Sequence, residues 1–114
     1  MVIQRGQIRW LDHGAGSLPA ERRPVVVVQA DALNKSAWRT CLVVSLTTNT
    51  SRAASPDHVY LPAGATGLAK NSVAVASHLN VVTQEQLLHE EPIGVLPAYL
   101  LADVEVALRA ALDL

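Results

Sequence analysis

The sequence has no phenylalanine and a single cysteine, Cys41, among its 114 residues. One thiol cannot form an internal disulfide, and a lone cysteine without a secretory leader pattern is typical of a protein in a reducing cytoplasm. No apolar run approaches the roughly 18 residues that a membrane-spanning helix needs. We therefore expect a cytoplasmic protein without membrane contact, folded as a single domain over residues 1–114.

Aromatic residues are also scarce, since only Trp10, Trp38, Tyr60 and Tyr99 are present. So few rings exclude a broad base-stacking surface of the kind that RNA-recognition domains use. They also give little support to an adaptor that binds proline-rich peptides in an aromatic groove. The core must be built from Val, Leu and Ala.

The net charge of −1 conceals an uneven distribution along the chain. Residues 1–52 carry seven Lys or Arg and three acids, a balance of +4, whereas residues 53–114 carry two and seven, a balance of −5. These charges either scatter over the folded surface or form a basic face and an acidic face. Only a basic face would attract phosphate groups.

Hydrophobic patterning predicts a mainly β (α+β) fold, a small barrel with one amphipathic C-terminal helix. The run Val25–Val28 suits a central strand that is buried on both faces. Thr83 and Gln86 have the spacing of a capping box before a short helix. Leu101, Val104, Leu108 and Ala111 form the apolar stripe of a helix over 98–112, with Pro97 in its first turn. We predict strands at 7–12, 24–29, 40–46, 58–61, 72–77 and 79–82, a turn or single helical turn at 31–36, and loops at 13–22 and 62–67.

Signatures of metal and cofactor sites are absent. The chain has no phosphate-binding glycine-rich loop, no paired cysteines, and four dispersed histidines. The group His89, Glu90 and Glu91 is followed by Pro92 and suits a solvated surface. Cys41 lies in an apolar strand and is expected to be a buried, inert thiol. We therefore predict no metal and no cofactor.

Two polar clusters flank consecutive predicted strands. Arg22 and Arg23 precede the valine run, and Thr47, Thr48 and Asn49 follow the next strand. If the two strands are antiparallel neighbours, Arg23 lies close to Thr47. A guanidinium beside hydroxyls and an amide is suited to bind phosphate. The alternative is a surface arginine beside an ordinary strand-end turn.

Five short motifs span almost the whole chain. They are Arg5-Gly6-Gln7-Ile8, Arg23-Pro24 with 25–29, Asp31 with Asn34, Leu46-Thr47-Thr48-Asn49, and Thr66-Gly67-Leu68 with Lys70-Asn71-Ser72-Val73. In this order and spacing the motifs resemble the MazF/PemK family of toxins. The resemblance implies an SH3-like barrel of the MazF/PemK/CcdB type that forms a homodimer. It further implies a sequence-specific, ribosome-independent endoribonuclease (mRNA interferase) that cleaves single-stranded RNA, inhibits translation and growth, and is neutralised by a cognate antitoxin with an acidic C-terminal segment.

The resemblance also implies roles for individual residues. Arg23 and Thr47 match the two positions to which the family assigns catalysis. Gly16 and Ser17 match a mobile loop that closes over RNA, and His78 falls where relatives often place a base-contacting Gln. Two positions depart from the family pattern, because Gln7 and Leu18 replace acidic residues.

The implied reaction is metal-independent attack by a ribose 2′-oxygen on the adjacent phosphorus. It leaves a 2′,3′-cyclic phosphate or 3′-phosphate and a 5′-hydroxyl, so DNA should be spared. Arginine is almost always protonated at neutral pH, so we expect Arg23 to act mainly as an electrostatic clamp, with proton donation as a second role. Thr47 would orient the phosphate or the 2′-hydroxyl. His13 is the candidate for proton transfer.

We expect the RNA itself to be bound mainly by hydrogen bonds, because aromatic rings are few. The main alternative to an RNA-cleaving toxin is a protein-binding toxin on the same fold, a gyrase poison like CcdB. CcdB acts through a C-terminal end that bears a tryptophan, whereas this chain ends in Leu112-Asp113-Leu114. The predicted RNA-binding residues are Ser17, Arg22, Gln29, Asn34, Thr48, Asn49 and His78.

Overall fold

The computed structural model describes residues 2–12 and 22–114. His13, Gly16, Ser17 and Leu18 of the predicted loop lie outside the described residues. The elements, in chain order, are β1 (Gln7–Leu11), β2 (Arg23–Val27), α1 (Asp31–Asn34), β3 (Thr40–Thr47), a 3₁₀ turn η2 (Thr50–Arg52), β4 (His58–Leu61), α2 (Ala63–Thr66), β5 (Ser72–Thr83), α3 (Gln84–Leu87), β6 (Gly94–Val95) and α4 (Ala98–Leu112).

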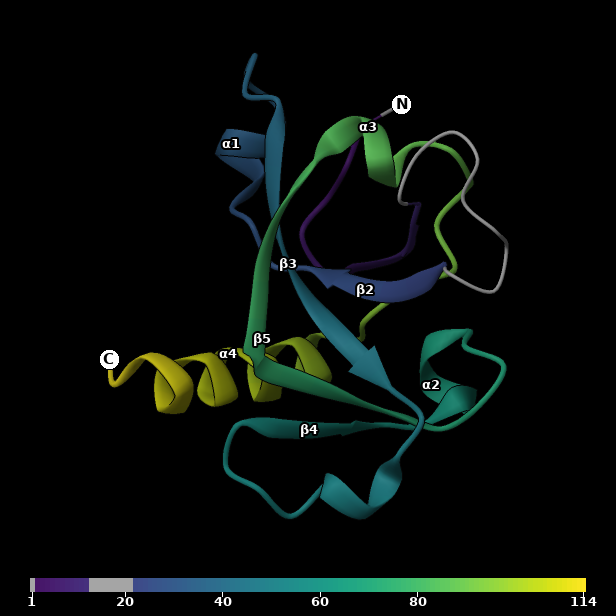
Figure 1. Ribbon diagram of the computed structural model, residues 1–114, viewed down its shortest axis with the longest axis vertical. Coiled ribbons are helices and arrows are strands. Elements are labelled where there is room, and N and C mark those ends of the chain that lie inside the picture. The colour runs from purple at the N-terminus through teal and green to yellow at the C-terminus, as the bar shows by residue number, and fades with distance from the viewer. Residues whose placement is uncertain (1, 13–21) are drawn as a thin grey trace.

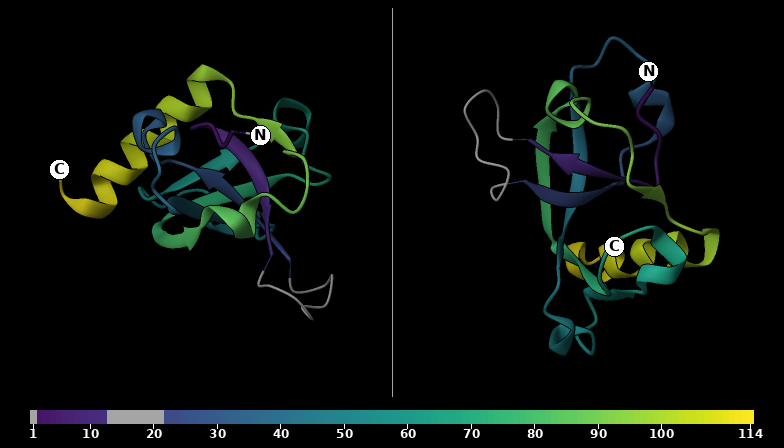
Figure 2. Two further views of the ribbon diagram at one scale, coloured as in Figure 1. Left: turned by 90° about the horizontal axis from the view of Figure 1, so that it is seen from above. Right: turned by 90° about the vertical axis from the view of Figure 1, so that its right-hand side faces the viewer.

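The strands form one antiparallel sheet in the order β4-β5-β3-β2-β1-β6. The sheet curls into a half-barrel, and α4 packs against β4 and β5 on one side of it (Figures 1 and 2). The predicted fold class, a mainly β barrel with a C-terminal helix, is confirmed. Among the described residues, no helix is long and apolar enough to cross a membrane.

Both faces of the sheet are covered, which explains the uninterrupted valine run in β2. Val26 and Val28 point into a core that α4 closes. Val25 and Val27 point into a second core on the other face, where Leu87 of α3 lies fully buried. Side chains alternate between the faces of a strand, so a strand that is buried on both faces needs apolar residues at every position.

β5 is one strand of 12 residues, although the sequence predicts two. Opposite β3 its register jumps, because Ser45 pairs with Val75 whereas Val44 pairs with Leu79. The extra residues form a bulge that bends the sheet. Polar residues at this bulge interrupt the apolar pattern, which is why the sequence predicts one strand that ends at 77 and another that begins at 79.

The C-terminal helix has its predicted bounds, but its buried stripe is rotated. Leu100, Val104 and Ala107 are the buried residues. Ala111 of the predicted stripe is exposed, because the C-terminal end of α4 extends beyond the sheet (Figure 1). Pro97 is the N-cap, so it precedes the first turn in which it was predicted, and its carbonyl accepts the N–H groups of Leu100 and Leu101.

The predicted loop at 62–67 contains the short helix α2, whose end packs tightly against β6. Gly67 ends α2 with a φ of +83°, a conformation that favours glycine. A Cβ atom at Gly94 in β6 would lie only 2.0 Å from the carbonyl oxygen of Thr66. The sequence did not predict β6, because two residues are too few to show a pattern. This contact fixes the segment that follows α2, beside the candidate site.

Candidate active site

Strand register brings Arg23 and Thr47 together. Arg23 begins β2 and Thr47 ends β3. The strands are antiparallel, with Val25 opposite Ser45, and two more steps in this register place Arg23 opposite Thr47. Arg23 is exposed and Thr47 is half-buried. Their predicted adjacency is confirmed, whereas their catalytic role stays a prediction.

Arg23 and Thr47 line one hollow of about 350 Å³, which we call the Arg23–Thr47 hollow. Polar groups dominate the chemistry of its wall, since a guanidinium faces the hydroxyl-bearing side chains of Thr47, Thr48 and the buried Ser72. Pro24 and Leu46 complete the lining. Such a combination of donors around an open space suits an anionic ligand.

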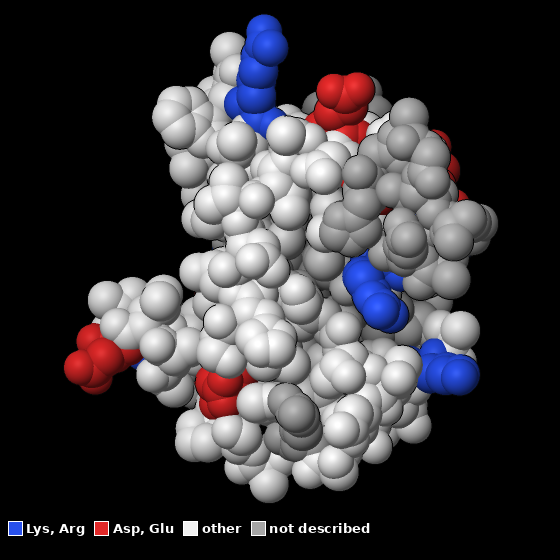
Figure 3. All heavy atoms as spheres, viewed as in Figure 1, with Lys and Arg blue, Asp and Glu red and all other residues white. Residues whose placement is uncertain are grey.

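A second hollow of about 260 Å³ adjoins the first, because both are lined by Arg23, Pro24, Thr48 and Ser72. We call the two together the cationic groove. Figure 3 shows two groups of Lys and Arg atoms on this side of the molecule, over β2 and α2 of Figure 1. Among the described residues, three cations and no carboxylate line the groove. The second hollow adds Trp10, Arg22, Leu68, Ala69 and Lys70.

The turn after β3 fixes the hydroxyl of Thr47. Thr47 Oγ1 accepts the backbone N–H of Asn49 at 3.2 Å, which leaves its own proton to be donated. Asn49 caps η2, since its Oδ1 accepts from the backbone N and the hydroxyl of Ser51. Thr48 lines both hollows. The oxygen of Asn49 is therefore used within the turn, whereas Thr48 is placed to meet a ligand.

Arg22 is held from two directions. Its guanidinium carbon lies 4.6 Å from the ring centroid of Trp10, which is cation–π geometry. Its Nη1 donates to Glu90, which follows α3. Trp10 pairs with Pro24 across β1 and β2, so the indole is fixed beside the groove by the sheet itself.

Gln29 and Asn34, two of the predicted RNA-binding residues, lie buried away from the groove, and their contact with RNA stays a prediction. Gln29 is 3% exposed and Asn34 is 5% exposed. Gln29 Nε2 donates to Asn34 Oδ1 at 2.9 Å and to the carbonyl of Thr40 at 3.0 Å, while Asn34 Nδ2 donates back to the carbonyl of Gln29 at 3.1 Å. Neither lines the cationic groove. Their amides bind each other and hold α1 against the sheet.

Other predicted site residues lie apart from the groove or outside the described residues. His78 is exposed in the β5 bulge and does not line the groove. Ser17 and His13 belong to the segment that the structure leaves undescribed. Gln7, one of the two departures from the family pattern, is buried, and its Oε1 accepts from Arg9 Nε at 2.8 Å and from the N–H of Gln4 at 2.9 Å.

Among the groove residues with a polar or aromatic side chain, sequence reasoning missed Trp10, Lys70 and Ser72. Lys70 and Ser72 belong to a motif that carries the family resemblance, but no strand pairing pointed from that motif to Arg23. Trp10 could have been found, since an antiparallel hairpin of the first two strands places it opposite Pro24. The missing information was the register between strands.

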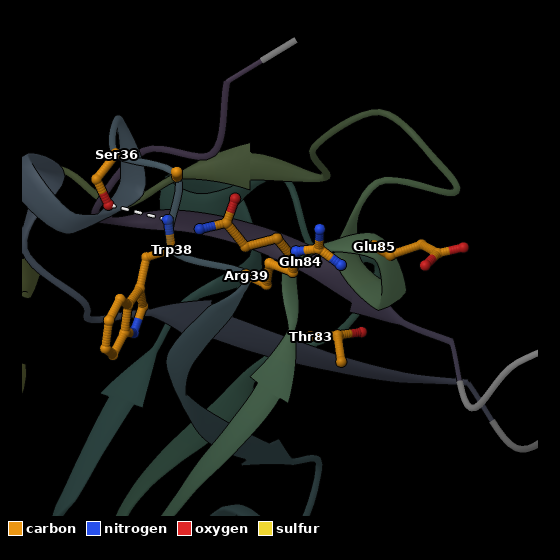
Figure 4. Close-up of a pocket in the computed structure, with 7 residues that line it drawn as sticks. Ser36, Trp38, Arg39, Thr83, Gln84 and Glu85 are labelled. Carbon is orange, nitrogen blue, oxygen red and sulfur yellow. Dashed lines mark hydrogen bonds between the residues drawn. The ribbon is translucent and has the colours of Figure 1, made fainter.

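A third hollow, of about 360 Å³, lies at the other end of β3, and its lining includes Trp38, Arg39, Thr83, Gln84 and Glu85 (Figure 4). It is separated from Thr47 by the length of β3, roughly 25 Å for eight residues. Within the described ranges, no group of three His, Cys, Asp or Glu residues could hold a metal ion. Burial raises the pKa of the Cys41 thiol to about 11, as expected for an inert cysteine.

The chain matches one family of known proteins over almost its whole length. A model of the PemK-like, MazF-like toxins of type II toxin–antitoxin systems matches residues 4–112. Endoribonuclease MazF6 of Mycobacterium tuberculosis (strain ATCC 25618 / H37Rv) is 40% identical over 116 residues, which is 100% of both chains.

Two solved structures share the fold. One is an endoribonuclease in complex with its cognate antitoxin from a mycobacterial species, with a TM-score of 0.79 and 23% identity over 98% of this chain and 96% of that one. The other is a MazE–MazF complex from Deinococcus radiodurans, with a TM-score of 0.78 and 24% identity over 100% and 98%. From the family match and the identity to the mycobacterial relative, this chain belongs to the PemK-like, MazF-like toxins of type II toxin–antitoxin systems.

Proposed function

We propose that this protein is a sequence-specific, ribosome-independent endoribonuclease toxin that cleaves single-stranded RNA and thereby inhibits translation and growth. The observation that carries the proposal is the convergence of Arg23 and Thr47 in a groove lined by three cations. The name of the mycobacterial relative, an endoribonuclease, supports the same activity. A gyrase-poison function would leave this arrangement without a purpose.

The proposed reaction is attack by the ribose 2′-oxygen on the adjacent phosphorus, with departure of the 5′-oxygen of the next nucleotide. The 2′-hydroxyl loses a proton and the departing 5′-oxygen gains one, and His13 is the proposed group for this transfer. Negative charge develops on the phosphoryl oxygens in the transition state, and the Arg23 guanidinium stabilises that charge more than the ground state. The Thr47 hydroxyl, held by the N–H of Asn49, donates to a phosphoryl oxygen or orients the 2′-hydroxyl. The products are a 2′,3′-cyclic phosphate and a 5′-hydroxyl end, formed without a metal ion, and attack of water on the cyclic phosphate converts it to a 3′-phosphate.

We also propose that the protein acts as a homodimer and is neutralised by a cognate antitoxin. The complexes of structural relatives with antitoxins support this partner. An acidic C-terminal antitoxin segment would be attracted to the same cations that bind RNA, so binding of the two would be competitive. Sedimentation of the purified chain measures the oligomeric state, and titration with antitoxin during cleavage measures the competition.

The test of the function is incubation of the purified protein with a long RNA, and with single-stranded DNA of the same sequence, in the presence of EDTA. We expect discrete RNA fragments with 5′-hydroxyl ends and intact DNA. Arg23→Ala and Thr47→Ala should each lower the cleavage rate by at least about 100-fold, the usual effect of removing a group that stabilises transition-state charge.

The matched control is Arg39→Ala, which removes the same charge from an exposed site at the other end of β3. It should cleave at close to the wild-type rate. Intact RNA with the wild-type protein would refute the endoribonuclease function, and full activity of Arg23→Ala would refute the assignment of the site.

A further inference from the structure

Arg22 lines the cationic groove, yet its guanidinium already has an anionic partner within the chain. The carboxylate of Glu90 binds Arg22 Nη1, with 33% of the arginine side chain and 41% of the glutamate side chain exposed. Glu90 itself does not line either hollow. The carboxylate therefore reaches the guanidinium from the rim of the groove, where solvent and ligands also have access.

The position of Glu90 is fixed by a buried arginine that plays no part in the proposed chemistry. Arg9 is 1% exposed, and its Nη1 donates to the carbonyls of Leu87 and Glu90 at 3.2 and 3.3 Å. A little further along, the N–H of Ile93 donates to the carbonyl of Ile8 at 2.7 Å. The backbone at Glu90 is thus tied to β1, the strand that carries Trp10.

These contacts place Arg22 between two groups fixed to the same strand, the indole of Trp10 and the carboxylate of Glu90. The indole can remain in contact when RNA binds, because it occupies the face of the guanidinium. The carboxylate binds Nη1 and partly neutralises the guanidinium. A phosphate that binds Arg22 through Nη1 must displace the carboxylate, and a phosphate at the remaining N–H groups is repelled by it. An ion pair this exposed is worth only about 0.2–1 kcal/mol, so a phosphate can displace it.

We propose that Glu90 is a built-in competitor of the RNA backbone, a carboxylate that occupies Arg22 until a phosphate of the bound RNA displaces it. Glu90 thereby lowers the affinity of the toxin for RNA. This inference rests on the proposed function and adds a residue that sets RNA affinity without taking part in the chemistry. The opposite role is that Glu90 holds Arg22 in place for RNA, and the two roles predict changes of opposite sign.

The experiment uses a fluorescent 12-residue oligoribonucleotide of mixed sequence with 2′-O-methyl groups throughout, which binds but cannot be cleaved. Binding to the full chain is measured by anisotropy at about 0.15 M salt, where the Debye length of roughly 8 Å screens distant charges. Glu90→Gln keeps the side-chain size and removes the charge. The matched control is Glu85→Gln, the same change at an exposed residue that lines the hollow at the other end of β3.

We expect Glu90→Gln to bind about 1.4- to 5-fold more tightly than wild type, the factor that corresponds to an exposed ion pair of about 0.2–1 kcal/mol. Glu85→Gln should match wild type. In the Arg22→Ala background the Glu90→Gln effect should vanish. With cleavable RNA, KM should fall while kcat stays unchanged.

Binding by Glu90→Gln that is weaker than wild type, or equal to that of Glu85→Gln, would overturn the proposal. So would a gain in affinity that persists in the Arg22→Ala background. These results are distinct from failure of the proposed function, which is intact RNA with the wild-type protein. Thermal unfolding of each variant verifies that the comparison is made between folded proteins.

Discussion

Replacement of Asn34 by Ala tests whether the Asn34 amide stabilises the fold or binds RNA. Asn34 Nδ2 donates to the carbonyl of Gln29 at 3.1 Å and to Asp31 Oδ1 at 3.2 Å, and its Oδ1 accepts from Gln29 Nε2 at 2.9 Å. Asp31 is exposed and can bind water instead. In the variant, the side-chain Nε2 and the backbone carbonyl of the buried Gln29 would each lose a hydrogen-bond partner.

An unsatisfied buried donor or acceptor costs about 1–3 kcal/mol. Two such groups lower the free energy of unfolding by about 2–4 kcal/mol if the space left by the amide admits some water. For a domain near 100 residues this corresponds to a fall in Tm of roughly 10–20 °C. The assay is thermal and urea unfolding of Asn34→Ala beside Asn80→Ala, an exposed asparagine that should change stability by less than about 0.5 kcal/mol.

Cleavage measured well below the Tm of the variant completes the test. Asn34→Ala should cut the same RNA positions as the wild type, because the amide lies buried away from the groove. A normal Tm would refute the claim that the amide pair holds α1. Normal stability together with altered cut sites would support the prediction that Asn34 binds RNA.

Three further predictions concern other parts of the fold. Burial raises the pKa of Cys41 to about 11, so iodoacetamide at pH 8 should modify the thiol only after unfolding; rapid alkylation of the native protein would contradict this. Hydrogen bonds from Ser77 and Ser55 lower the pKa of Asp57. The carboxylate therefore stabilises the fold fully above about pH 4, the usual pKa of Asp, and this stabilisation is lost as the pH falls further. Between pH 6 and 2, the free energy of unfolding of Asp57→Asn should fall less steeply than that of the wild type. Gly94→Ala should lower the free energy of unfolding by at least about 2 kcal/mol, because its Cβ would clash with the carbonyl oxygen of Thr66. The control is Gly64→Ala, which has open space around it and should leave thermal stability unchanged or raise it.

Local patterning predicted much of the fold, because the strands and α4 bury one or both faces. The Val25–Val28 run predicted a central strand buried on both faces, and all four valines are buried. The capping box of Thr83 and Gln86 is also formed as predicted. The bulge in β5 and the two-residue β6 were not predicted. Both depend on contacts with distant residues, the bulge with β3 and β6 with Thr66, and such contacts leave no periodic signal.

The candidate site was predicted as far as pairing of adjacent strands allows. Arg23 and Thr47 follow from two consecutive antiparallel strands. Lys70 reaches the groove through α2 and the start of β5, which no local rule connects to β2. Gln29 is the last residue of the predicted strand 24–29, where a polar side chain looks available in the sequence, yet the structure buries it. Its partner, Asn34, is only five residues away, yet the spacing alone does not show that the two amides face each other.

The charge of the groove follows from neither the net charge nor the split between halves of the chain. Acids of the second half pair with arginines of the first, as Glu105 does with Arg5 and Glu90 with Arg22, and Lys70 of the acidic half lines the groove. Charges further apart than a Debye length, roughly 8 Å at physiological salt, are largely screened. An RNA phosphate in the groove is therefore governed by the three lining cations and by the carboxylate that touches one of them. A net charge of −1 therefore does not prevent RNA from binding in the cationic groove. In our proposal, Glu90 at the rim of the groove lowers the affinity for RNA.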